Sequence, residues 1–93
     1  MLPRMARPIL YIKPGCPWCT EALDYFRRKG VALELRDVIA DAALMRELVA
    51  VSGQSKCPTF RHGGEVKADF GTDEFVAWAR QRPALCAEIG LQP

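Results

Sequence analysis

Two thiols three residues apart give this sequence its clearest chemical signal. Cys16 and Cys19 enclose Pro17 and Trp18, between a strand-like run and a helix-like run. Because positions i and i+3 share one face of a helix, the two sulfurs can meet and interconvert between dithiol and disulfide. The free N–H groups and the dipole at the start of the helix would stabilise a thiolate on Cys16, and Pro17 suits the first helical turn. We therefore expect Cys16 to be the nucleophile and Cys19 the resolving thiol.

The remaining cysteines and the single histidine predict no second site of this kind. Half a zinc site and a fixed disulfide are the alternatives for Cys16 and Cys19. Zinc would need a second pair of ligands, whereas Cys57 and Cys86 stand alone and His62 is isolated, so we expect no metal site. Cys86 should be buried and inert on an apolar helix face, and His62 should be a surface turn residue. The strand before the pair and the helix after it favour redox chemistry.

The length and charge of the chain limit what it can be. Its 93 residues suffice for a single domain, which we expect to span residues 1–93 with its core at about 8–82. A net charge of +2 provides no field that would recruit nucleic acid. No apolar stretch of signal-peptide length follows Arg4 and Arg7, and no run reaches the length of a membrane span. We expect a cytoplasmic monomer with no membrane and no nucleic-acid partner, in a compartment that keeps thiols reduced.

Apolar periodicity and turn residues predict the elements that position the two thiols. Strands are expected at 8–13, 31–38, 58–62 and 65–69, and a Gly63-Gly64 turn joins the last two. Helices are expected at 17–29, from an Asp41 cap to about 52, from a Thr72 cap to about 82, and over a short segment at 84–90. The order β-α-β-α-β-β-α predicts an α/β fold with a small four-stranded mixed sheet and helices on both faces.

The segment 31–38 alternates apolar and polar residues, with Val31, Leu33 and Leu35 in one series. Alternation of this kind is typical of a strand that buries one face and exposes the other. We expect this strand at an edge of the sheet, with the three apolar side chains facing inward.

Three separate motifs resemble the signature blocks of dithiol glutaredoxins. They are the run from Tyr11 to Cys19, the pair Gly53-Gln54 followed by Cys57-Pro58-Thr59, and Gly71-Thr72-Asp73. The resemblance covers about residues 8–82, with the motifs in the right order. It implies a thioredoxin-like fold and the reduction of glutathione mixed disulfides and protein disulfides. Glutathione is then a co-substrate, and no cofactor is held permanently.

The resemblance also implies which residues contact glutathione. They are Lys13, Gln54, Cys57, Pro58, Thr72 and Asp73. Pro58 matches the family's cis-proline, and Cys57 before it would offer its backbone N–H and C=O to an extended thiol substrate. Thr72 and Asp73 begin a helix, whose free N–H groups would bind the γ-glutamyl carboxylate. Lys13 and Gln54 match positions that hold the glycyl carboxylate.

The chain departs from the family pattern at several of these positions. The family usually carries a basic residue after the position of Gln54 and Thr-Val before the proline, whereas this chain reads Ser55-Lys56-Cys57. Either Lys56 replaces the missing cation or recognition of the glycyl carboxylate is weaker. Phe70, at a common glycine position, is expected to narrow the γ-glutamyl end of the groove. Cys57 is either a small residue used for its backbone or a thiol able to form an alternative mixed disulfide.

Two other functions remain as alternatives. A [2Fe–2S] cluster carrier would use the first cysteine and glutathione, but Pro17 and the absence of a Cys-Gly-Phe-Ser signature argue against it. A thioredoxin-like protein recycled by a flavoenzyme would not need Lys13 or the Gly71-Thr72-Asp73 block, which favour glutathione.

Overall fold

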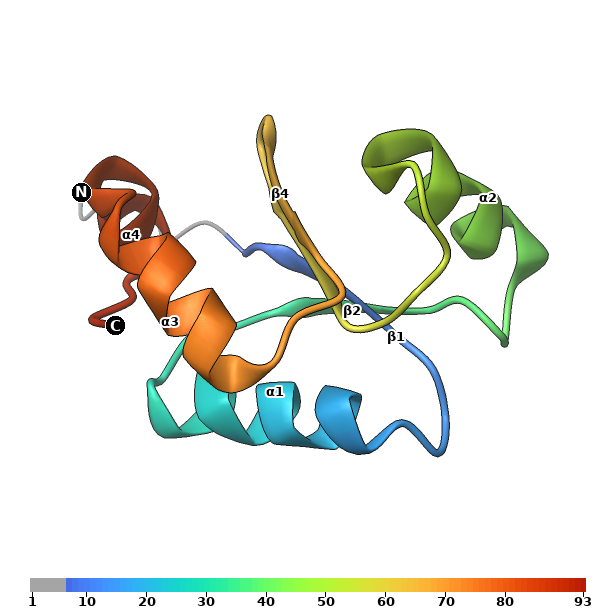
Figure 1. Ribbon diagram of the computed structural model, residues 1–93, viewed down its shortest axis with the longest axis horizontal. Helices are drawn as coiled ribbons and strands as arrows, with labels where there is room; N and C mark the ends of the chain where they lie inside the picture. The colour runs from blue at the N-terminus through green and yellow to red at the C-terminus, as the bar shows by residue number, and fades with distance from the viewer. Residues whose placement is uncertain (1–6) are drawn as a thin grey trace, which may run out of the picture.

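The computed structural model describes residues 7–93, and strands and helices alternate there in the predicted order (Figure 1). The elements are β1 (Ile9–Ile12), α1 (Pro17–Arg28), β2 (Glu34–Asp37), α2 (Ala42–Ser52), β3 (Thr59–His62), β4 (Glu65–Ala68), α3 (Thr72–Arg80) and α4 (Pro83–Ile89). The first six residues of the expected domain, Arg4 among them, lie outside the described residues. Within residues 7–93, none of the helices has the length and apolar character that a membrane span requires.

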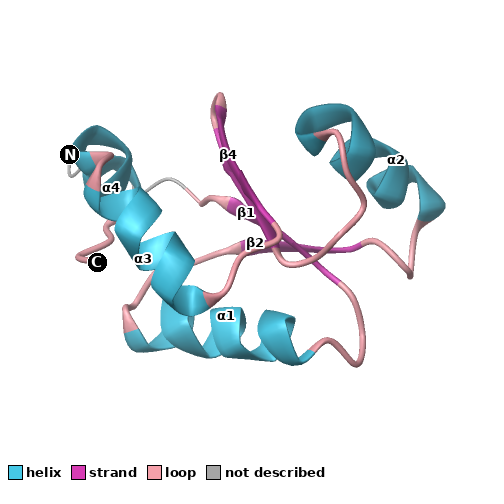
Figure 2. Ribbon diagram, viewed as in Figure 1, coloured by secondary structure: helices cyan, strands magenta, loops and turns pink. Residues whose placement is uncertain are grey.

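The four strands form one mixed sheet in the order β2-β1-β3-β4 (Figure 2). β1 pairs in parallel with β2, and α1 makes the crossover between them, whereas β3 is antiparallel to both β1 and β4. Gly63, with φ 58°, provides the left-handed turn between β3 and β4. The predicted α/β fold, a small mixed sheet with helices, is confirmed.

Each face of the sheet packs against different helices. Leu10 lies opposite Phe60 in the β1–β3 register, and both side chains are buried among residues of α1, α3 and α4. Tyr11 lies opposite Thr59, and Tyr11 packs in a second cluster with Leu48 of α2. Successive side chains of a strand point to opposite faces, so β1 and β3 contribute to both cores. Figure 1 shows α2 on the side of the sheet away from α1 and α3.

The strand at the sheet edge is shorter than expected, because β2 covers only Glu34–Asp37 and Val31 and Leu33 precede it. Its position at the edge of the sheet is confirmed. Val31 is buried in the cluster with α1, and Leu33 packs against that cluster. Leu35 pairs with the buried Leu10 but is 49% exposed, since it lines an open hollow with Leu23 at the edge of the sheet. The expected inward series therefore holds for Val31 and Leu33, and Leu35 is the exception.

The last two helices also differ from prediction at their ends. Gly71, not Thr72, is the N-cap of α3, and its N–H donates to Glu74 Oε1 at 3.1 Å. This bond is one half of a capping box, in which a carboxylate at the third helical position accepts the N–H of the cap residue. Gly71 has no side chain to accept an N–H of the helix in return. α3 ends at Arg80, and Pro83 opens α4 instead of preceding it.

His62 is not a free turn residue. Its Nε2 lies 3.0 Å from Oε2 of Glu88 on α4, and its side chain is partly buried. The contact joins the end of β3 to α4. These two elements are distant in the sequence, so the pairing could not be predicted from the residue pattern.

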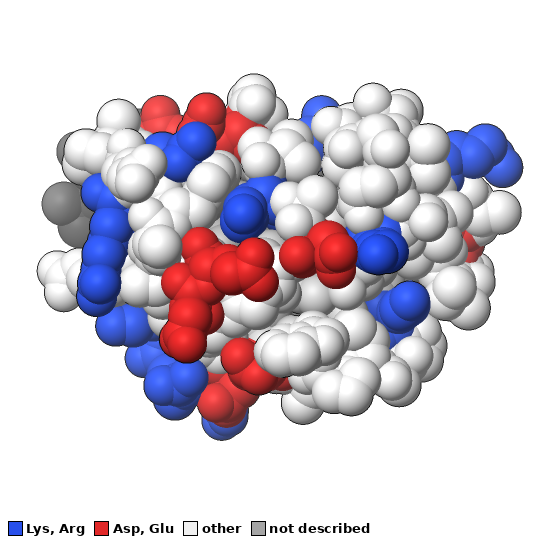
Figure 3. Space-filling view, viewed as in Figure 1, with Lys and Arg blue, Asp and Glu red and all other residues white. Residues whose placement is uncertain are grey.

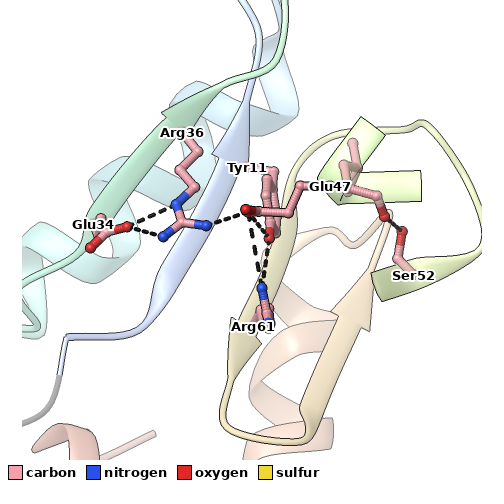
Figure 4. A network of polar contacts seen from close by, with 7 residues as sticks. Tyr11, Glu34, Arg36, Glu47, Ser52 and Arg61 are labelled. Atoms are coloured by element: carbon pink, nitrogen blue, oxygen red, sulfur yellow. Dashed lines mark hydrogen bonds and ion pairs between the residues drawn. The ribbon is translucent and has the colours of Figure 1, made fainter. Parts of the chain in front are cut away.

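A polar network joins the sheet to α2 on the far side from α1 (Figure 4). The buried Tyr11 hydroxyl donates to Glu47 Oε2 at 2.6 Å, and Arg61 Nη1 donates to the Tyr11 oxygen at 3.3 Å. Arg36 forms ion pairs with both Glu47 and Glu34. The hydrogen bond from Tyr11, together with Arg36, holds the pKa of Glu47 below its ordinary value. Glu47 is therefore the anionic centre of the network.

Replacing Glu47 by glutamine should destabilise the protein at neutral pH and not in acid. We expect Glu47→Gln to lose about 1 kcal/mol at pH 7, since the site is partly solvated and an amide accepts more weakly than a carboxylate. Because folding lowers the pKa of Glu47, its contribution is present above about pH 4.3, the unfolded value, and is lost as the pH falls through the folded value. Urea unfolding of wild type and Glu47→Gln at pH 7 and at pH 3 measures the loss of stability at each pH.

Glu21→Gln, at an exposed position of α1, is the matched control and should leave stability within about 0.5 kcal/mol of wild type. A loss in Glu47→Gln that is equally large at pH 3 would assign the effect to packing and not to charge.

The surface carries both signs of charge. Figure 3 shows Lys and Arg side chains interspersed with Asp and Glu on the face drawn, with neither sign covering it. This distribution agrees with the small net charge of +2.

Candidate redox site

The first cysteine of the motif caps the first helix. After β1 the chain turns at Gly15, whose φ of 69° lies in the left-handed region. Cys16 follows as the N-cap of α1 with φ −100° and ψ 107°, and Pro17 occupies the first helical turn. The Cys19 N–H donates to Cys16 Sγ at 3.2 Å. The sulfur thus takes the place of the usual capping oxygen, and the same N–H would stabilise it as a thiolate.

The Cys16 sulfur also touches the segment that leads into β3. Its thiol donates to the backbone carbonyl oxygen of Cys57 at 3.7 Å. The following peptide bond, Cys57–Pro58, is cis, as the family pattern predicts. The fold therefore brings Cys16, Cys19, Cys57 and Pro58 together from segments about forty residues apart.

The second cysteine of the motif is held in its protonated form. Cys19 is buried, and burial together with its hydrogen bond to Cys16 raises the pKa of Cys19 to about 12. A thiol with such a pKa does not compete with Cys16 as the attacking group at neutral pH. It is placed instead to donate a hydrogen bond to Cys16 and to react once Cys16 carries a disulfide.

Cys86 lies apart from this site, as predicted. It packs in the cluster formed with α3 and α4, and its thiol donates to the Ala79 carbonyl oxygen at 3.2 Å. Burial raises the pKa of Cys86, which keeps it protonated.

Lys13 brings a positive charge to the thiols. It follows β1 directly, and its side chain is exposed. Burial raises the pKa of the Cys57 thiol, and the Lys13 ammonium draws that pKa back down. A cation at this position is available both to a neighbouring thiolate and to an anionic substrate group.

The amide of Gln54 is bound within its own loop. It donates to Ser52 Oγ at 2.8 Å and to Thr59 Oγ1 at 3.1 Å, while its Oε1 accepts the Lys56 N–H at 2.7 Å. Thr59 Oγ1 in turn donates to the Lys56 carbonyl at 2.8 Å. Gln54 and Thr59 therefore fix the segment that presents Cys57. The sequence analysis did not predict this positioning role of Gln54. The hydroxyl side chains of Ser52 and Thr59, close to Gln54 in the sequence, are the one signal that could have indicated it.

The start of α3 lies beside the dithiol helix. Trp18 is 59% exposed, and a Cβ on Gly71 would lie 3.5 Å from its indole ring. A hollow of about 240 Å³ opens between them, lined also by Asp69, Phe70 and Glu74. This hollow lies at the start of α3, with Trp18 of the Cys-x-x-Cys segment on its rim.

Two residues of the third motif occupy the first turn of α3. Thr72 is the first residue of α3, and its Oγ1 is buried with no hydrogen-bond partner within residues 7–93. Asp73 is exposed beside it. The first N–H groups of a helix have no intrahelical partner, so this turn can accept an anion.

Phe70 and Lys56 make contacts that their motif positions do not indicate. Phe70 is buried, with its ring centroid 5.0 Å from that of Phe75, and it also lines the hollow beside Trp18. Lys56 forms an ion pair with Asp69 at 3.8 Å, with both side chains largely exposed, so its ammonium already has an anionic partner.

A Cys-x-x-Cys pair at the start of a helix, facing a cis-proline at the start of an antiparallel strand, defines the thioredoxin-like class. Solved structures agree with this assignment. The thioredoxin-like protein BC3987 is 30% identical with a TM-score of 0.69, over 76% of this chain and 97% of that one. Glutaredoxin from Brucella melitensis is 27% identical with a TM-score of 0.65, over 96% of each chain. A glutaredoxin from Archaeoglobus fulgidus, 20% identical over 82% of this chain and 88% of that one, shares the fold with a TM-score of 0.69.

Within this class the family is settled by the sequence model. The Glutaredoxin family model matches residues 9–67, so the chain belongs to the glutaredoxin family. A comparison with curated proteins gave no match. Membership places the chain among the thiol–disulfide oxidoreductases.

Proposed function

We propose that this protein is a glutathione-dependent oxidoreductase that reduces glutathione mixed disulfides and protein disulfides. One observation carries the proposal, namely the Cys16 sulfur held between the Cys19 N–H at 3.2 Å and the Cys57 carbonyl at 3.7 Å. Glutathione is a co-substrate, no cofactor is bound permanently, and the cytoplasm is the compartment that would supply reduced glutathione.

In the first step the Cys16 thiolate attacks the glutathione sulfur of a mixed disulfide. A new bond forms between Cys16 and glutathione, and the substrate leaves as a thiolate that takes up a proton. The Cys19 N–H stabilises the charge on Cys16 before the attack. The backbone of Cys57 would align the substrate by short strand addition.

The second step depends on the substrate. With a small mixed disulfide, a second glutathione attacks the adduct on Cys16 and leaves as glutathione disulfide. With a protein disulfide, Cys16 first attacks one sulfur of that disulfide and the other sulfur leaves as a thiolate that takes up a proton. Cys19 then loses its proton, attacks Cys16 Sγ and releases the bound protein sulfur as a second thiol. Glutathione then reduces the Cys16–Cys19 bond. The raised pKa of Cys19 means that its attack requires proton transfer to the leaving thiolate.

Glutathione would bind along the groove from Lys13 to the start of α3. Lys13 would pair with the glycyl carboxylate, and Cys57 and Pro58 would contact the cysteinyl part. The free N–H groups at Thr72 and Asp73 would hold the γ-glutamyl carboxylate, with the Asp73 side chain available to the amino group. Gln54 would act through the loop that it orders, since its amide is already hydrogen-bonded.

A coupled assay tests this proposal. Purified protein, glutathione and glutathione reductase are mixed with a small glutathione mixed disulfide, and NADPH oxidation is followed. We expect saturable turnover that requires glutathione. Turnover only when thioredoxin reductase replaces both components would reject the glutathione proposal and favour the thioredoxin-like alternative.

The resolving cysteine should be dispensable for the small substrate alone. Cys19→Ser removes the internal disulfide route but leaves attack by Cys16 and release by a second glutathione. We expect activity on the mixed disulfide within about threefold of wild type, and a clearly larger loss on a protein disulfide, whose release from Cys16 depends on an internal thiol. The ratio of the two kcat/KM values measures this. An equal loss on both substrates would contradict the proposed division of labour.

A further inference from the structure

Three of the four cysteines gather in one place, although only two belong to the Cys-x-x-Cys motif. Cys16, Cys19 and Cys57 lie in the same buried cluster, together with Tyr11, Val38 and Leu48. Cys86 belongs to the other cluster. The Cys16 thiol touches the Cys57 carbonyl oxygen at 3.7 Å, and that oxygen is two bonds from the Cys57 Cα. A disulfide needs Cα atoms within about 7 Å of each other, a range that this contact brings within reach.

We propose that Cys57 is a second resolving thiol, which forms a disulfide with Cys16 in place of Cys19. This inference rests on the proposed function, since Cys16 must first carry a mixed disulfide. It adds a catalytic group to the site, because the Cys57 sulfur would bond directly to the reacting sulfur of Cys16.

The step exchanges one disulfide for another. The Cys57 thiol loses its proton, its sulfur attacks Cys16 Sγ, and the bond between Cys16 and glutathione breaks. Glutathione leaves as a thiolate and takes up the proton. The substrate disulfide that loaded Cys16 is the oxidant. One glutathione then opens the Cys16–Cys57 bond to give Cys57 thiol and a glutathione adduct on Cys16, and a second releases glutathione disulfide.

The surroundings of Cys57 suit this role better than those of Cys86. Both thiols are buried, and burial raises the pKa of each. Lys13 offsets part of the effect of burial on the pKa of Cys57, while Cys16 and Asp37 oppose Lys13, whereas burial is the cause that raises the pKa of Cys86. The decisive difference is position, because Cys57 lies in the cluster of Cys16 and Cys86 lies in the other cluster.

The linked form would differ from the ordinary Cys16–Cys19 disulfide in its effect on the site. The Cys57 main chain is the segment proposed to align substrate, and a bond to Cys16 would hold that segment against the nucleophile. Substrate would then have no access until glutathione reopens the bond. The protein would lose activity when glutathione is scarce and recover it when glutathione returns.

Peptide mapping of Cys19→Ser tests the inference. The reduced variant is treated with glutathione disulfide or, in a parallel arm, with a small aromatic disulfide, and is then denatured, alkylated and digested with trypsin. Trypsin places the cysteines on separate peptides, residues 5–27, 57–61 and 81–93. We expect the 5–27 peptide linked to 57–61 in both arms, about tenfold above the simple adduct on Cys16, because the second thiol is already in place.

The controls separate this bond from random oxidation. In Cys19→Ser combined with Cys57→Ser, Cys16 should keep the adduct. A link between 5–27 and 81–93 at comparable yield would indicate scrambling in unfolded molecules and would overturn the inference, as Cys86 is equally buried. If Cys19→Ser does not fold, Cys19→Ala serves in its place.

The two proposals can fail separately. An adduct on Cys16 with Cys57 fully alkylated, alongside normal turnover in the coupled assay, rejects the second resolving thiol and keeps the proposed function. The Cys16–Cys57 link in the aromatic arm without glutathione-dependent turnover supports the thiol and rejects glutathione as the reductant.

Discussion

Cys16→Ser should reduce turnover in the coupled assay by at least about 10³-fold, to the level of the uncatalysed reaction with glutathione. Serine is a good N-cap, so α1 should form as before, but a hydroxyl at neutral pH is a far weaker nucleophile than a thiolate. The Cys19 N–H would still have an acceptor, which removes misfolding as the cause. The measurement is kcat/KM for a small glutathione mixed disulfide, with circular dichroism to verify the fold.

Cys86→Ser is the matched control, because Cys86 is as buried as Cys16 and lies in the other cluster. Its activity should stay within about twofold of wild type at a temperature where it is folded. Substantial turnover by Cys16→Ser would show that another group carries the reaction.

Phe75→Ala should cause the largest loss of stability. Phe75 is fully buried, and its ring centroid lies 5.0 Å from the centroids of Phe26, Phe60 and Phe70. Removal of the ring leaves a cavity at the point where α1, β3 and α3 meet. We expect a loss of about 3–5 kcal/mol, a large part of the roughly 5–15 kcal/mol that stabilises a domain. Urea unfolding followed by far-UV circular dichroism gives the difference.

Ile39→Ala provides the comparison for this variant. Ile39 is 63% exposed, so removal of its side chain should cost less than about 0.5 kcal/mol. A Phe75→Ala protein that unfolds at the same urea concentration as Ile39→Ala would contradict the assignment of Phe75 to the centre of the core.

The order and type of the elements were predictable because apolar periodicity follows local geometry. Pro17 and Asp41 mark the starts of α1 and α2 where the structure has them. The edge position of β2 was predicted correctly, but alternation does not report how completely a neighbouring helix covers a face of the strand. Leu35 pairs with a buried residue, Leu10, yet it lies beside a hollow that α1 covers only in part. The N-cap of α3 was placed one residue late, because Gly71 has no capping side chain and its own N–H donates to Glu74.

The candidate site was predictable where chemistry depends on adjacent residues. The spacing of Cys16 and Cys19 is enough to place one sulfur over the backbone of the other. Contacts between segments that are distant in the sequence were harder to predict. The hydrogen bonds of Gln54 to Ser52 and Thr59 depend on how the loop folds back on itself. Phe70 is buried because its ring packs against Phe75 in the core. A comparison of short motifs does not reveal such a packing contact.

Among the four buried thiols of the reduced protein, Cys16 is the sulfur that we propose attacks first. Reduced wild-type protein, folded and then unfolded in urea, is treated briefly with iodoacetamide at pH 7, and the alkylation rate of each cysteine is read from its tryptic peptide by fragmentation. Cys16 should react faster in the folded protein than in the unfolded one, whereas Cys19, Cys57 and Cys86 should react more slowly when folded. Protection of Cys16 by folding, to the same degree as Cys86, would contradict its role as the attacking thiol.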